Sequence, residues 1–129
     1  MNIIKIKVAL LSLLPVLVQA HSLEPAQAIR YSYDGYTQIR MKAVNRYDKT
    51  TRFAVEVFAD REKTLPISFK AFPEELTLGP DNERKFMVKI DEAPSILYIC
   101  TKSIEGRQAG GLIASRICSA VRVVERGVN

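Results

Sequence analysis

Two stretches near the C-terminus decide the fold: ILYICTKSIE at residues 96–105 and ASRICSAVRVVER at residues 114–126. Both are rich in β-branched and aromatic residues, which suit a half-buried strand, and a glycine-bearing loop joins them. The pattern predicts a β-hairpin with Cys100 on its first strand and Cys118 on its second. Paired Cα atoms on neighbouring antiparallel strands lie within disulfide range, so these two cysteines can form a bridge.

The N-terminus has the pattern of a secretory signal peptide. Lys5 and Lys7 precede an apolar run over residues 8–18, and Val18-Gln19-Ala20 has the small–x–small form of a cleavage site. The apolar run is too short for a typical spanning helix, so we favour a signal peptide at residues 1–20 over a membrane anchor. In an exported chain, two cysteines favour one disulfide over free thiols.

The remainder, residues 21–129, has the length of one domain. Residues 36–44, 52–60 and 84–90 alternate apolar and polar side chains, which predicts half-buried antiparallel strands. Their predicted inward residues are Ile39, Met41 and Ala43, then Phe53, Val55, Val57 and Ala59, and finally Phe86, Val88 and Ile90.

Three further features complete the predicted fold. Residues 22–33 look extended but contain Pro25, which places them at a sheet edge or at a switch between sheets. Residues 67–72 form a short strand, and residues 79–82 (GPDN) form a turn. About seven strands at this spacing predict an all-β, immunoglobulin-like sandwich.

Charge and motifs exclude several function classes. Removing Lys5 and Lys7 from the 19 basic residues leaves 17, against 14 acidic ones, which is mildly basic. The charges alternate along the strands and do not cluster with aromatic residues, so we expect solvated sheet faces and no nucleic-acid partner. There is a single histidine and neither a GxGxxG motif nor a P-loop, so we expect no enzyme activity.

The single histidine, His21, would become the N-terminal residue after cleavage behind Ala20. An N-terminal histidine can chelate copper through its amine and its ring, and imidazole suits copper. Exported sandwich proteins that bind copper in this way normally add a second histidine, which is absent here. We therefore expect a disordered terminal residue and no cofactor, with copper binding as a minor alternative.

Several segments resemble the N-terminal immunoglobulin-like domain of PapD-like periplasmic pilus chaperones. The resemblance covers nearly the whole of residues 22–126, and its order and spacing agree. The matching segments are SLEPAQAIRY at residues 22–31, IRMKAVNR at residues 39–46 with the characteristic Asn45, FPEELTLGPDNERKFMVKI at residues 72–90, ILYICTKSIEG at residues 96–106, and the last strand, ASRICSAVRVVER. The cysteine placement resembles the subgroup with a disulfide between the last two strands.

The resemblance implies a periplasmic chaperone that completes the unfinished sandwich of a pilin-like partner by strand addition. The positions matching the donated side chains are Ile113, Ser115 and Ile117. A basic pair that binds the partner's C-terminal carboxylate would fall on Gln27, which has lost the charge, and on Arg122, which keeps it. We therefore expect residues 112–124 to offer a free strand edge, unless this strand lies inside its sheet.

One departure from the family concerns length. Typical members have a second sandwich domain, whereas this chain ends at Asn129, so half of the carboxylate cleft would be missing. The sequence therefore leaves an alternative function, that of a structural or adaptor subunit of a secretion or conjugation apparatus.

Overall fold

A computed structural model describes residues 21–32, 35–104 and 115–125 of the chain. The predicted signal peptide and Ile113 lie outside the described residues. Nine strands and no helix occur within them, so no described helix is long and apolar enough to cross a membrane. The strands are β1 (His21–Glu24), β2 (Gln27–Ser32), β3 (Tyr36–Asn45), β4 (Thr51–Phe58), β5 (Lys70–Phe72), β6 (Glu75–Leu78), β7 (Glu83–Asp91), β8 (Ile96–Ser103) and β9 (Arg116–Glu125).

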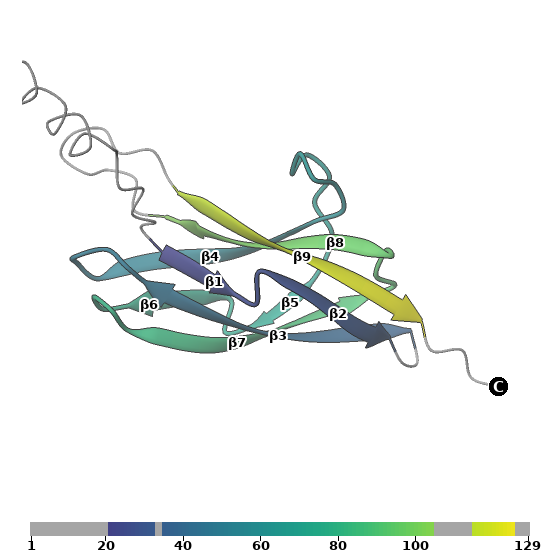
Figure 1. Cartoon of the computed structure of the whole chain (residues 1–129), viewed down its shortest axis with the longest axis horizontal. Coiled ribbons are helices and arrows are strands. Elements are labelled where there is room, and N and C mark those ends of the chain that lie inside the picture. The colour runs from purple at the N-terminus through teal and green to yellow at the C-terminus, as the bar shows by residue number, and fades with distance from the viewer. Residues whose placement is uncertain (1–20, 33–34, 105–114, 126–129) are drawn as a thin grey trace, which may run out of the picture.

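The strands form two sheets packed face to face, as the sequence predicts (Figure 1). One sheet has the order β1-β3-β7-β5 and the other the order β2-β9-β8-β4-β6. The predicted first strand divides at Pro25: β1 pairs with β3 in the first sheet, and β2 pairs with β9 in the second. Pro25 therefore marks a switch between sheets. The β2–β9 pair is parallel, whereas every other strand pair in the described residues is antiparallel.

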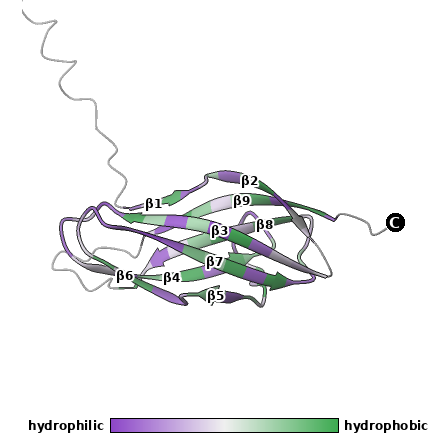
Figure 2. Ribbon diagram, turned by 90° about the horizontal axis from the view of Figure 1, so that it is seen from below, coloured by the Kyte–Doolittle hydropathy of each residue, from purple (hydrophilic) through white to green (hydrophobic). Residues whose placement is uncertain are grey.

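Alternate residues of the central strands fill the core, which explains the alternating hydropathy along β3 and β7 (Figure 2). The predicted inward residues of β3, β4 and β7 are buried, except Ala59, which follows the end of β4 and is half-buried. Residues 75–78, which were not among the predicted strands, form β6 because Leu76 and Leu78 enter the core beside β4. This extra strand and the division at Pro25 raise the predicted seven strands to nine.

Asn45 is fully buried at the end of β3 and joins two turns. Its Nδ2 donates to the carbonyl oxygens of Leu78, at 2.8 Å, and Lys49, at 3.0 Å. Its Oδ1 accepts from the Tyr47 backbone N–H at 2.9 Å. One amide side chain thus satisfies backbone groups that would otherwise lack partners in the interior.

Candidate protein-binding edge

Strand β9 has neighbours on both sides over only part of its length. It pairs with β8 from Arg116 to Arg122, whereas β2 pairs with it only from Ala120 onward. Within the described residues, no strand is hydrogen-bonded to residues 116–119 on the side away from β8, although β1 of the other sheet lies close to β9. We call this short backbone segment the open edge. The expected free edge over residues 112–124 is therefore wrong for residues 120–124, and residues 112–114 lie outside the described part.

Among the described residues, the backbone groups of the open edge have no strand partner on one side. The Ser103 N–H donates to the Ser115 carbonyl, so the backbone groups of Ser115 point toward β8. The Ala120 N–H donates to the Ala26 carbonyl on the opposite side. Because these directions alternate along an antiparallel strand, the N–H and C=O groups of Arg116 and Cys118 point away from β8. A strand added from another chain would meet these groups.

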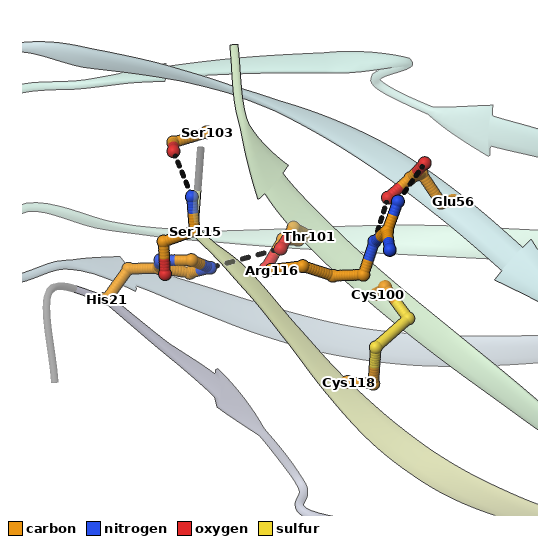
Figure 3. Close-up of polar contacts among 8 residues, drawn as sticks. All are labelled: His21, Glu56, Cys100, Thr101, Ser103, Ser115, Arg116 and Cys118. Atoms are coloured by element: carbon orange, nitrogen blue, oxygen red, sulfur yellow. Dashed lines mark hydrogen bonds and ion pairs between the residues drawn. A yellow bond between two sulfur atoms is a disulfide. The ribbon is translucent and has the colours of Figure 1, made fainter. Parts of the chain in front are cut away.

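The side chains of β9 separate onto two faces. Ile117 points inward and packs against the core while remaining partly accessible, and Ser115 is half-buried. Arg116 points outward, where it forms an ion pair with Glu56 at 2.8 Å (Figure 3). Its guanidinium also lies over the Phe58 ring, 5.3 Å from the centroid. The two accessible inward residues are thus at the end of the sandwich where the open edge lies.

The predicted disulfide between Cys100 and Cys118 is present. The two residues are direct partners in the β8–β9 register, and the bridge lies beside the Arg116–Glu56 ion pair (Figure 3). Since Cys118 belongs to the open edge, the bridge ties that edge to the interior strand β8. A partner strand can therefore form hydrogen bonds with β9 without breaking this link.

His21 is fully buried and contacts β8, so the expectation of a disordered terminal residue is wrong. Its Nε2 donates to the Thr101 carbonyl oxygen at 3.1 Å, and its ring packs against Phe53 with centroids 4.8 Å apart. Nδ1 has no hydrogen-bond partner among the described residues. Burial lowers the pKa of His21 and outweighs the hydrogen bond to Thr101, which raises it. Copper binding remains an untested alternative.

The predicted carboxylate-binding positions lie on the outer face of the β2–β9 pair. Gln27 is in register with Ala120, and Ile29 is in register with Arg122, so Gln27 and Arg122 are diagonal neighbours. Arg122 also faces Ile96 of β8. Ile29 is 55% exposed and Ile96 50%, so an exposed arginine lies between two exposed isoleucines. We call Ile29, Ile96 and Arg122 the outer row; sequence reasoning missed its two isoleucines because their register was not known.

Comparison with solved structures identifies the class of fold: an immunoglobulin-like sandwich of the PapD-like type. The Escherichia coli chaperone DraB matches with a TM-score of 0.64 at 16% identity, over 80% of this chain and 53% of that chain. A complex of the Salmonella enterica SafA pilin with the SafB chaperone matches with a TM-score of 0.64 at 12% identity, over 89% of this chain and 59% of that chain. This chain thus spans little more than half of those chains.

A PapD-like domain of human CEP192 also matches, with a TM-score of 0.52 at 8% identity, over 89% of this chain and 95% of that chain. By sequence, no protein-family model and no curated protein matches the chain. At these identities the comparisons define the fold, which is the one that the sequence resemblance predicted.

Proposed function

We propose that this chain is an exported, non-enzymatic binding module of the periplasm that assists assembly of a pilus or another envelope structure. It acts by adding β9 to the incomplete sheet of a partner subunit. The observation that carries the proposal is the open edge, whose unpaired backbone groups lie beside partly accessible inward side chains. Structural likeness to pilus chaperones, one of them in complex with a pilin, supports the choice of partner.

Strand addition combines two interactions at the open edge. The N–H and C=O groups of Arg116 and Cys118 would form main-chain hydrogen bonds with the partner strand, which supply affinity. Ile117 and Ser115, at a spacing of two residues, would face the partner's apolar groove together with Ile113. A serine between two isoleucines makes the donated surface less apolar, so main-chain hydrogen bonding has the larger role.

The outer row would provide a second point of contact. Arg122 could form a charge-assisted hydrogen bond with a partner's carboxylate, and the flanking isoleucines could cover the apolar side chain next to it. Gln27 could donate a further hydrogen bond through its amide. With one cation in place of two, we expect this anchor to be weaker than one formed by a basic pair.

A second candidate is a structural or adaptor subunit of a secretion or conjugation apparatus. The match to the CEP192 domain supports it, because a PapD-like domain that is not a pilus chaperone aligns over 89% of this chain and 95% of its own length. The two candidates differ in the lifetime of the complex: a chaperone releases its partner during assembly, whereas a structural subunit stays in the finished assembly.

The test uses two variants of Arg116, since this N–H faces the open edge. Proline removes the N–H and is tolerated on an open strand edge, so Arg116→Pro should stay folded. Arg116→Ala is the matched control, because it also loses the ion pair with Glu56 but keeps the N–H. We expect Arg116→Ala to retain its envelope partner in co-purification from the host periplasm and Arg116→Pro to lose it.

Hydrogen exchange of the purified chain gives a second readout. The amides of Arg116 and Cys118 should exchange rapidly alone and become protected when the partner is bound. Two results would mean that the open edge is already paired and would refute the proposal. One is slow exchange of both amides in the isolated chain, and the other is unfolding of Arg116→Pro but not of Arg116→Ala.

A further inference from the structure

The outer face of the other sheet carries a shallow groove with a volume of about 840 Å³. It crosses β1, β3, β7 and β5, on the opposite side of the sandwich from the outer row. We call it the basic groove and define it by Arg40, Lys42, Lys85, Met87 and Phe72. None of these five residues takes part in the strand addition proposed above.

Strand register gives the basic groove an apolar centre. Met87 of β7 is the partner of both Arg40 on β3 and Phe72 on β5, so these three residues form one row across the sheet. The Phe72 side chain is 54% exposed, and Met87 is half-buried beside it. An aromatic ring this exposed on a sheet face costs solubility, and such rings are enriched where proteins bind other proteins.

The cations around this centre are incompletely neutralised. Lys42 pairs with Glu24 at 3.1 Å and Glu83 at 3.4 Å, and these carboxylates raise the pKa of Lys42. Arg40 lies in the apolar row and Lys85 in the next one, opposite Lys42. Neither Arg40 nor Lys85 has an ion pair among the described residues. The groove therefore presents two cations without an ion pair beside an exposed apolar patch, and its three cations against the carboxylates of Glu24 and Glu83 leave a net positive charge.

We propose that the basic groove binds an acidic segment of a second protein, with one large apolar side chain seated on Phe72 and Met87. Two carboxylates of that segment pair with Arg40 and Lys85, since opposite charges across an interface favour the matching partner. A second copy of this chain is a poor occupant, because two such grooves would bring like charges together. A continuous phosphate backbone is also disfavoured, since Glu24 and Glu83 lie at the same face.

The test measures binding of a labelled peptide in which one phenylalanine lies among aspartates and glutamates. The full chain is titrated at low salt, and two control peptides replace the phenylalanine by serine or the acidic residues by lysines. We expect saturable binding of the first peptide only, weakened by added salt, with amide shifts in NMR spectra at β3, β5 and β7. Arg40→Glu/Lys85→Glu should weaken it at least about tenfold, as should Phe72→Ala.

Arg61→Glu is the matched control, because Arg61 is exposed on a loop outside the groove. It should bind like the parent chain, and melting curves of all variants should stay close to that of the parent. Three outcomes would each overturn the proposal. The double variant could bind the peptide as well as the parent does, or the amide shifts could be confined to β8 and β9. Alternatively, the groove could bind duplex DNA or anionic vesicles in place of the peptide. Because Arg40, Lys85 and Phe72 lie away from β9, these outcomes do not depend on strand addition.

Discussion

Removing the disulfide by Cys118→Ala should destabilise the domain by an amount that the loop length sets. The bridge joins residues 18 positions apart. In the chain-entropy model, opening a loop of that length restores about 3 kcal/mol of conformational freedom to the unfolded state. For a domain of this size, unfolding entropy near the midpoint is about 0.23 kcal/mol per kelvin, so the melting temperature should fall by about 13 °C.

Cys118 is the better position to change, because it is half-buried whereas Cys100 is fully buried. Alanine at position 118 leaves the β8–β9 backbone ladder intact and adds no unpaired polar group. The assay is thermal unfolding followed by circular dichroism, with the parent chain measured in the presence and absence of a reductant. The reduced parent should melt close to Cys118→Ala, and the reductant should leave the variant unchanged.

The result that would refute this reasoning is a fall of less than about 4 °C in both the variant and the reduced parent. The unfolded chain would then be as restricted without the bridge as with it. Mass spectrometry under non-reducing conditions is the control that the bridge is complete in the starting material.

Three further predictions concern single side chains. Burial lowers the pKa of His21 below 6.5, so on acidification the unfolded state binds a proton before the folded state does. The free energy of unfolding should therefore decrease as pH falls below about 6.5. His21→Gln should flatten this pH dependence in denaturant titrations. Asn45→Ala should cost about 2 kcal/mol or more in the same titrations, since buried backbone groups of Leu78 and Tyr47 lose their partner; a cost below about 0.5 kcal/mol would contradict that role. Arg122→Glu should leave the melting temperature unchanged but weaken partner co-purification, and unchanged co-purification would remove Arg122 from the site.

Sequence patterns predicted the sandwich because its central strands alternate strictly. Buried residues recur at every second position in β3 and β7, as in Ile39 and Met41, and in Phe86 and Val88. Strict alternation of this kind predicts a half-buried strand. Pro25, through its missing N–H, indicated either a sheet edge or a switch between sheets, and the structure has the switch. Local chemistry of this kind is visible in a sequence without knowledge of the partners.

Features that depend on contacts across the fold could not be predicted in this way. The burial of His21 requires Thr101 and Phe53 to lie opposite it, and nothing in the local sequence indicates their position. The outer row depends on the register of three strands, and the extent of the open edge depends on where β2 meets β9. Both parts of the proposed site are therefore set by strand pairing and only indirectly by residue type.

The crossing at Pro25 has a consequence for how such a binding edge can change. Because β2 begins two residues after Pro25, the position of the crossing decides how much of β9 is covered. The four described residues left open, 116–119, span about 13 Å. Moving the crossing earlier in the chain by two residues would halve this length. Moving the crossing later would lengthen the open segment along β9, past residue 119. The position of one proline thus sets the length of β9 that is available to a partner strand. This length can change without any change in the residues that touch the partner.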